Sequence, residues 1–330
     1  MDNNVYNKIY TKEKWEKVNK YNKELMEDYL IELKSQKKKE GTIKQYKNDL
    51  RIMFIYIYDE LDNAPIHKLK KKAFRNYLLW LKDRDMSNAR INRLMSALRS
   101  MLEYASNEED YEDEIEINYA SKVKGLSKES VREIFFLSDD KIETMYNHLV
   151  KENKLQKACY LAMLYDTAAR RNEIHQIEKT NLLESNFTNK VVGKRGKVFT
   201  LMYFDRSKEA IKAWLEQRGE DDIKSLWVVG KGENKRPASY VTLYNWVQDF
   251  VELYEELFEE KIQFNAHSFR HSALESLSTG EHYICKKLNK KFDLQDLKLL
   301  AHHSDISTTD SYLKNKDDEK LAEAFGFALS

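Results

Sequence analysis

Apolar positions recur every three or four residues through the first third of the chain, which is the pattern of amphipathic helices. Gly41 is a natural stop for the first of these helices, Thr42 is a suitable N-cap for the second and Ser87 for the fourth. Short turns between such helices favour a compact helical bundle. The predicted helices cover residues 12–34, 43–58, 70–83 and 88–106.

The pattern changes in the second part of the chain. Ser138 precedes two acids and predicts a helix start, because acids suit the positive end of a helix. Two β-branched and aromatic runs within 190–204 flank Gly193-Lys194-Arg195-Gly196 and predict a β-hairpin, and 226–229 predicts a further short strand. The fold class is therefore mainly α with a small antiparallel β-sheet. Further helical or amphipathic segments are predicted at 154–168, 170–182, 207–218, 239–258, 268–278, 293–301 and 306–313.

These patterns divide the chain into two domains. Residues 1–118 form a helical domain, in which residues 1–11 are either part of the fold or a flexible tail. Residues 138–330 form the second domain. Residues 119–137 are the predicted linker. At 330 residues, each part is long enough to bury a core of its own.

Composition limits the class of protein. The chain has only 9 Gly and 2 Pro, 34% of its residues are charged, and no apolar run approaches the roughly 18 residues of a membrane helix. Its start carries no apolar signal-peptide core, and Cys159 and Cys285 lack metal-type spacing. We therefore expect a cytoplasmic protein with reduced thiols and no membrane association.

The net charge of +1 hides an uneven distribution. Residues 1–105 hold 23 basic and 15 acidic side chains, and residues 106–118 hold seven acids and no base. The basic stretch 1–105 is consistent with binding a polyanion such as duplex DNA, whereas ordinary solvated surface charge is the alternative. The candidate phosphate contacts in this domain are Lys37, Lys38, Lys39, Lys71, Arg84, Arg90 and Arg93.

Chemistry-bearing residues concentrate in the second domain. His303 and Tyr312 are nine residues apart in a hydroxyl-rich stretch, and His267 and Arg270 share one helix face. Arg170 follows an apolar helix, and Lys194 lies at the hairpin turn. Each residue taken singly has an ordinary structural explanation, as a surface charge, a hairpin tip or a helix cap.

The order and spacing of these residues resemble the tyrosine recombinases, the family of phage integrases and chromosome-dimer resolvases. The segment Thr167-Ala168-Ala169-Arg170 with Glu173 is similar to the family's Thr-Gly-Leu-Arg box with its acid three residues later. The turn Gly193-Lys194-Arg195-Gly196 is similar to the family's Gly-Lys-Gly hairpin. The third box, His-x-x-Arg-His, is matched by residues 267–271. The last box normally reads Leu-Gly-His-Ser; here His302 stands at the glycine, and the spacing to Tyr312 selects His303 as the family histidine.

The resemblance implies a site-specific DNA recombinase that works through a covalent 3′-phosphotyrosyl intermediate. The implied catalytic residues are Arg170, Lys194, His267, Arg270, His303 and Tyr312, with Glu173 in support. No cofactor or metal is expected, because the arginines supply the positive charge. The i, i+4 pair His267/His271 looks like half a zinc site but lacks the glutamate of the metalloprotease motif. Lys235 and Arg236 join the candidate DNA contacts of the first domain as two further candidates in the second domain.

The resemblance also implies partners: double-stranded DNA, and further copies of the chain in a synaptic tetramer. A C-terminal helix over about 317–328 is expected to pack in a neighbouring protomer, although packing on its own domain stays open. Two other functions remain as alternatives, a type IB topoisomerase-like relaxing enzyme and a catalytically silent DNA-binding protein. Within the recombinases, the sequence leaves integration, excision, resolution and inversion for a phage or mobile element undecided.

Overall fold

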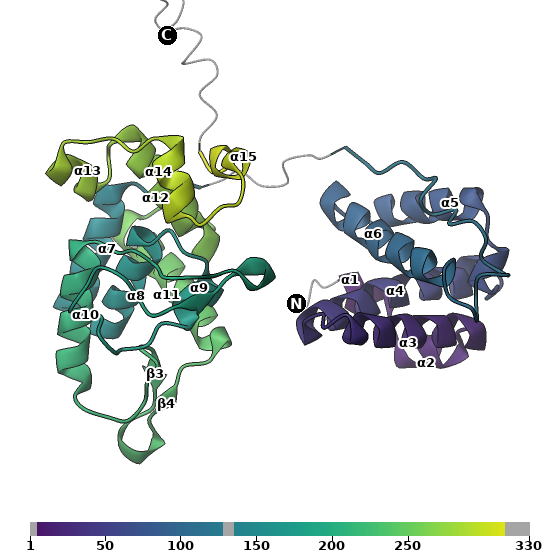
Figure 1. Cartoon of the computed structure of the whole chain (residues 1–330), viewed down its shortest axis with the longest axis horizontal. Helices are drawn as coiled ribbons and strands as arrows, with labels where there is room; N and C mark the ends of the chain where they lie inside the picture. Colours follow the sequence, from purple (N-terminus) through teal and green to yellow (C-terminus); the bar gives the residue numbers. More distant parts are fainter. Residues whose placement is uncertain (1–4, 128–134, 314–330) are drawn as a thin grey trace, which may run out of the picture. The chain divides into compact units, whose positions relative to one another are not determined.

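The chain folds into two compact units, Met1–Glu133 and Ile134–Ser330, each with its own hydrophobic core. The computed structural model describes residues 5–127 and 135–313 (Figure 1). It is mainly helical with two small antiparallel strand pairs, which confirms the predicted fold class. None of the helices within these described ranges is both long and apolar enough to cross a membrane.

The first unit is a helical bundle in which α4 packs against α3 and α6, and α5 against α6. Apolar residues on one face of each helix build its core, including the buried Leu25, Phe54, Tyr77 and Leu98. The helices are α1 (Val5–Ile9), α2 (Lys12–Lys17), α3 (Lys20–Ser35), α4 (Glu40–Glu60), α5 (Lys71–Lys82) and α6 (Asn88–Ala105).

Two predicted helix ends in this unit differ from the structure. The segment 12–34 is broken at Val18, whose ψ of 141° is not helical, because Asn19 hydrogen-bonds to Asn63 in a distant turn. Gly41 was predicted to stop a helix but lies inside the first turn of α4, since the chain already reverses at Lys37 with a φ of 56°. The Ser87 cap is confirmed by its bond from the Arg90 amide.

The first unit also extends beyond its predicted end. Ala120 and Val123 are buried in its core, and Arg99 donates hydrogen bonds to their carbonyl groups. Tyr111 and Ile115 of the acidic stretch are buried as well. Residues 119–127 therefore pack on this unit, although the sequence placed them in the linker.

The second unit is built around α8, which is buried along most of its length and packs against α7, α10 and α12. Ser138 caps α7 as predicted. The helices are α7 (Asp139–Lys151), α8 (Leu155–Asp166), α9 (Arg171–His175), α10 (Asp205–Arg218), α11 (Tyr240–Phe258), α12 (Ala266–Thr279), α13 (Tyr283–Leu288), α14 (Leu294–Leu300) and α15 (Ile306–Asp310).

Two hairpins complete the second unit. Strand β1 (Val191–Val192) pairs with β2 (Val198–Phe199), and β3 (Val228–Val229) pairs with β4 (Arg236–Pro237). The predicted helix over 170–182 shrinks to α9, because the Asn189 side chain bonds to the backbone of Gln176 and Glu178 and holds the chain extended. The sequence missed α13, which begins at a His282 side-chain cap.

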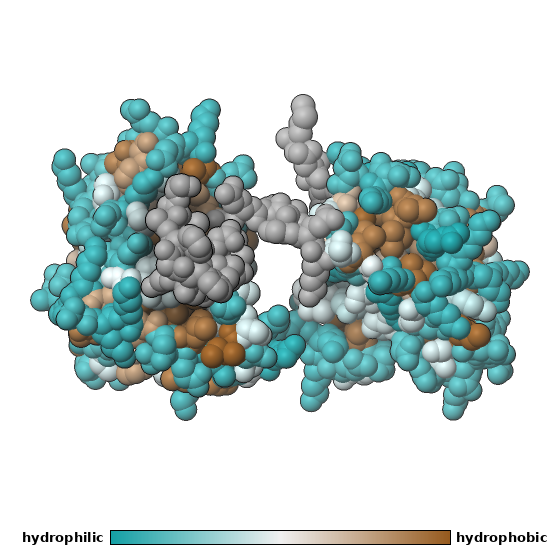
Figure 2. All heavy atoms as spheres, turned by 90° about the horizontal axis from the view of Figure 1, so that it is seen from above, coloured by the Kyte–Doolittle hydropathy of each residue, from teal (hydrophilic) through white to brown (hydrophobic). Residues whose placement is uncertain are grey.

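Hydrophilic residues cover most of the face shown in Figure 2, and hydrophobic side chains gather there in separate patches. The expected C-terminal helix over 317–328 lies outside the described residues.

Candidate active site

Arg170 lies where the chain leaves α8 and enters α9. The turn passes through Ala168 at a φ of 47° and is held by Thr167, whose hydroxyl oxygen accepts from the Ala169 amide. The backbone and guanidinium of Arg170 both donate to the Glu173 carboxylate, at 2.8 and 3.1 Å. Glu173 is buried, so it fixes the arginine head group in one orientation.

Arg270, on α12, is almost fully buried at 1% exposure. It donates to the carbonyl oxygens of Ala168 and Ala301, the latter at 2.7 Å, and so ties the Arg170 loop to the segment after α14. Burial and the nearby charge of Arg170 lower the pKa of Arg270 to about 10. Two guanidinium groups near each other make a site that favours an anion.

His303 connects Arg270 to the end of the chain. An arginine only donates, so the contact from Arg270 to His303 Nε2 requires that nitrogen to be unprotonated. The proton then lies on Nδ1, which donates to the Thr309 hydroxyl at 2.9 Å. Burial together with the charges of Arg270 and Arg170 lowers the pKa of His303 to about 3, so the ring is neutral at pH 7.

The Tyr312 ring lies among three histidines. Its centroid is 5.0 Å from that of His267, 4.3 Å from His271 and 4.9 Å from His303, and the guanidinium carbon of Arg270 is 5.2 Å away. Partial burial and neighbouring positive charge lower the pKa of His267 to about 4. Neutral imidazoles, which accept protons, therefore surround the hydroxyl-bearing ring.

Lys194 lies at the exposed tip of the β1–β2 hairpin, directly after Gly193. The tip adjoins a cavity of about 300 Å³ that holds basic side chains and, among the described residues that line it, no acid. Such a cavity suits a phosphate group. Its lining residues are Arg170, Lys194, Arg195, Lys197, Phe199, His302, His303, Ser304 and Thr308.

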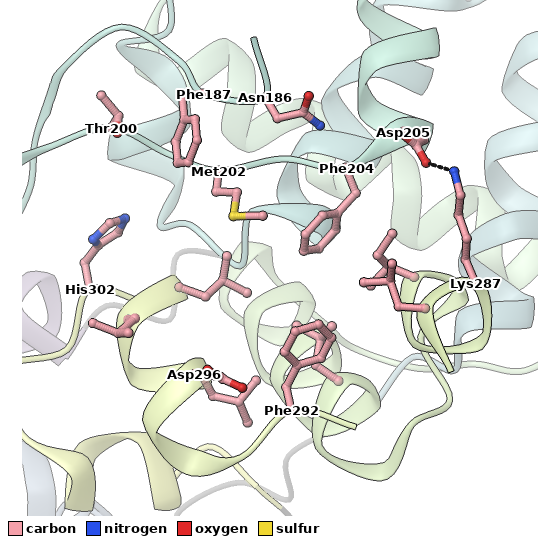
Figure 3. Close-up of a pocket in the computed structure, with 16 residues that line it drawn as sticks. Asn186, Phe187, Thr200, Met202, Phe204, Asp205, Lys287, Phe292, Asp296 and His302 are labelled. Carbon is pink, nitrogen blue, oxygen red and sulfur yellow. Dashed lines mark hydrogen bonds and ion pairs between the residues drawn. The ribbon is translucent and has the colours of Figure 1, made fainter. Parts of the chain in front are cut away.

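A second cavity, of about 600 Å³, shares His302 with the first and is mostly apolar. Figure 3 shows His302 at one end of it and the ion pair of Asp205 with Lys287 at the other. Phe187, Met202, Phe204 and Phe292 lie between them. The His302 side chain therefore borders both the basic and the apolar cavity.

The structure gathers the residues singled out from sequence into two overlapping groups. Arg270 contacts His303, and the His303 ring packs against the Tyr312 ring. The His267 ring lies against the same tyrosine ring. Arg170 and Lys194 line the basic cavity together with His303. His303 belongs to both groups, so the basic cavity adjoins the tyrosine.

Two residues of the site lie within the family motifs but were assigned no catalytic role from sequence. His271 stacks on Tyr312, and its Nδ1 is 3.0 Å from the Tyr312 carbonyl oxygen. Thr309 fixes the His303 tautomer. The signals were present, since His271 lies one helical turn from His267 and Thr309 six residues after His303, but neither spacing alone indicates a contact.

The candidate DNA contacts are less uniform. Arg90 and Arg93 both pair with the buried Asp49 carboxylate, at 3.3 and 3.1 Å, so their head groups already have an internal partner. Arg84 stacks on Trp80 at 3.6 Å from the ring centroid. Lys235 pairs with Asp221 at 3.1 Å. The remaining candidates are exposed side chains: Lys37, Lys38, Lys39, Lys71 and Arg236.

Within the described ranges, no three His, Cys, Asp or Glu side chains are grouped to hold a metal ion. His267 and His271 lie with their ring centroids 5.1 Å apart, and both rings contact Tyr312. Both cysteines are buried free thiols, as expected.

Comparison with known proteins decides the family. The sequence profile described as "Phage integrase family" matches residues 136–319, and that described as "Phage integrase, N-terminal SAM-like domain" matches residues 26–109. The chain belongs to the phage integrase family. It is thus a tyrosine recombinase, an enzyme of site-specific DNA recombination.

Individual relatives agree with this placement. The chain is 25% identical to the SPbeta prophage-derived recombinase-like protein YomM of Bacillus subtilis strain 168, over 94% of this chain and 92% of the relative. The fold matches the Tn1549 transposon integrase in complex with transposon right end DNA, with a TM-score of 0.67 and 16% identity, over 91% of this chain and 98% of that one. A lambda integrase tetramer bound to a Holliday junction matches with a TM-score of 0.65 and 14% identity, over 89% and 77%.

Proposed function

We propose that this recombinase cuts DNA by attack of the Tyr312 hydroxyl on a phosphodiester, which leaves a 3′-phosphotyrosyl link and a free 5′-hydroxyl. The observation that carries the proposal is the position of Tyr312, against His303 and Arg270 and next to a cavity lined with basic side chains. A second 5′-hydroxyl then attacks the phosphotyrosine and reseals the strand, because the bond energy is kept in the ester.

Arg170 and Arg270 act on the phosphate. Attack builds negative charge on the non-bridging oxygens, and fork-shaped guanidinium donors held in place stabilise that charge without reorganising. Glu173 holds the first arginine, and the carbonyls of Ala168 and Ala301 hold the second. Because the arginines supply the charge, the step needs no metal ion.

Lys194 and the histidines handle the protons. The lysine ammonium donates to the leaving 5′ oxygen, and a neutral histidine beside the ring accepts the proton that Tyr312 gives up. His267 and His303 have lowered pKa values, at about 4 and about 3, and are therefore unprotonated before attack. Once its Nε2 has taken up a proton and released Arg270, His303 also donates a hydrogen bond to the phosphate.

The partners follow from the family and its relatives. We propose that the chain binds duplex DNA in the cytoplasm with both units and that four copies assemble on two duplexes. A lambda integrase tetramer on a Holliday junction has the same fold, and residues 1–105 have an excess of basic side chains. Residues 317–328 link neighbouring copies in this proposal. The match to a prophage-derived recombinase-like protein and to a transposon integrase favours a phage or mobile-element enzyme.

The test uses DNA that traps the covalent state. The protein is incubated with fragmented genomic DNA, covalently bound fragments are recovered and sequenced, and the shared site is built into a duplex nicked a few bases from the cut. Release of the short strand then prevents resealing. The wild type should give a slower-migrating protein–DNA adduct.

Tyr312→Phe should give no adduct and keep its DNA affinity, whereas Tyr244→Phe, on the exposed face of α11, should behave as the wild type. An adduct from Tyr312→Phe overturns the proposal. Relaxation of supercoiled plasmid that lacks the site would instead favour a topoisomerase activity. Binding to the site without any adduct from the wild type would favour a silent DNA-binding protein.

A further inference from the structure

His302 occupies a backbone conformation that favours glycine. Its φ is 53°, and Ala168, the other residue that replaces a usual family glycine, has a φ of 47°. A residue with a Cβ costs on the order of 1 kcal/mol more than glycine in this region. A large ring at such a position therefore calls for a compensating contact.

The contact is an aromatic stack with the hairpin. The His302 ring lies on Phe199 with centroids 3.9 Å apart and planes 20° from parallel. From the same hairpin, Lys197 Nζ donates to the His302 carbonyl oxygen at 3.3 Å. The hairpin is thus attached to His302 through both a ring contact and a hydrogen bond.

Phe199 also packs against Gly193, the residue before Lys194. A Cβ on Gly193 would lie 2.6 Å from a Phe199 ring carbon, so the ring fills the space above that glycine. The Gly193 amide donates to the Lys197 carbonyl oxygen at 2.8 Å and closes the turn. His302, Phe199 and Gly193 therefore form a continuous stack that ends at Lys194.

His302 is also followed directly in the chain by His303, whose side chain contacts Arg270. The His302 ring borders the basic cavity and, as Figure 3 shows, one end of the apolar cavity. Movement of this ring would change the place of the lysine hairpin relative to the arginine that binds the phosphate.

We infer that His302 is a positioning residue, whose ring clamps Phe199 and holds Lys194 over the scissile phosphate. The inference rests on the proposed function. In the step it serves, the Tyr312 oxygen bonds to phosphorus, the bond from phosphorus to the 5′ oxygen breaks, and an ammonium proton of Lys194 moves to that oxygen. The products are the phosphotyrosine, a 5′-hydroxyl and a neutral lysine amine, and the tyrosine proton goes to a histidine.

The test separates proton donation from all other roles. It compares single-turnover cleavage of the mapped DNA site with cleavage of the same site carrying sulfur in place of the 5′-bridging oxygen. A thiolate leaves without a proton, so the sulfur substrate does not need Lys194. Lys194→Ala should lose about 10²–10⁴-fold on ordinary DNA and little on sulfur DNA.

His302→Gly should follow the same pattern to a smaller extent. We expect a loss of about ten- to a hundredfold on ordinary DNA, as for a misplaced catalytic group, and a rate within about twofold of the wild type on sulfur DNA. His302→Phe, which keeps a stacking ring, should retain most of the activity on both substrates. Val198→Ala, on the exposed neighbour of Phe199, should change neither rate.

Phe199→Leu provides a second route to the same result if the glycine variant folds poorly. It should reproduce the His302→Gly pattern, and the double variant should be no slower than either single one, because both remove one contact. An unchanged rate in His302→Gly, or equal losses on both substrates, overturns the inference. Failure of sulfur to rescue Lys194→Ala would instead contradict the proposed role of Lys194.

Discussion

At the scale of single residues, Arg270 joins three segments of the second unit. Its guanidinium connects the carbonyls of Ala168 and Ala301 and contacts His303, although its Nε has no partner among the described residues. A lysine has one point charge and cannot make these contacts at once.

Arg270→Lys should therefore lower the free energy of unfolding by about 1–3 kcal/mol, because a buried acceptor loses its donor. It should also slow DNA cleavage by about 10²–10³-fold. Urea denaturation and single-turnover cleavage measure the two effects. Arg75→Lys, at an exposed position on α5, is the stability control. Wild-type stability in Arg270→Lys would contradict the bridging role.

A second residue-scale prediction concerns His282, which is fully buried 3.8 Å from the Asp166 carboxylate. Burial lowers the pKa of His282 to about 3, from an ordinary 6.5. The unfolded chain gains this proton below pH 6.5 while the folded chain does not, so stability is lost as the pH falls from 6.5 towards 3. Burial raises the pKa of Asp166 to about 6, which gives the opposite slope between about pH 6 and 4.

His282→Asn keeps a side-chain acceptor for the Ile284 amide but no longer titrates. The stability of the wild type should fall more steeply than that of the variant below pH 6.5, by up to about 1.4 kcal/mol per pH unit. Calorimetry of the whole chain at pH 7.5, 6.0 and 5.0 gives the two slopes. Parallel pH profiles would show that His282 titrates in the folded chain as it does in the unfolded one.

At the scale of elements, a substitution at Gly41 tests whether this residue belongs to the first turn of α4. The residue is exposed in the first turn, and an added Cβ meets no atom within 4 Å. Gly41→Ala should stabilise the first unit by about 0.5–1 kcal/mol, because alanine loses less backbone entropy in a helix.

Gly232 is the matched contrast. A Cβ there also meets nothing within 4 Å, but its φ is 54°. Gly232→Ala should destabilise the protein by on the order of 1 kcal/mol. Thermal unfolding of both variants distinguishes helix propensity from left-handed strain, and a loss of stability in Gly41→Ala would contradict the helical assignment of that turn.

The elements that could be predicted from sequence are those set by local patterns. The apolar stripes of α5 and α6 and the Ser87 and Ser138 caps gave their bounds to within about a residue. The break at Val18 could not be predicted, because it depends on a hydrogen bond between Asn19 and the distant Asn63.

The same division holds for the site. The family resemblance predicted His303 and Tyr312 as site residues, because a motif fixes distances along the chain. The stack of His302 on Phe199 joins segments about a hundred residues apart and has no local signal. The pairing of Arg90 and Arg93 with Asp49 is likewise tertiary, and their contact with DNA stays a prediction.

At the scale of the whole molecule, each unit has its own core. Fragments 1–127 and 135–330 should therefore each unfold cooperatively. The second fragment contains all six proposed catalytic residues and should still form the adduct, with weaker DNA binding. Its binding should also depend less on salt, because the basic side chains of residues 1–105 no longer displace counterions. A second fragment without a cooperative transition would contradict the independence of the units.

The covalent link of Tyr312 to a 3′-phosphate of DNA is the step on which the proposed function depends. The adduct formed on the nicked duplex can be digested with protease and nuclease and sequenced by mass spectrometry. We expect a nucleotide on the peptide that contains Tyr312, joined through its 3′-phosphate, with a free 5′-hydroxyl on the other DNA end. A link to another residue, or to a 5′-phosphate, would contradict it.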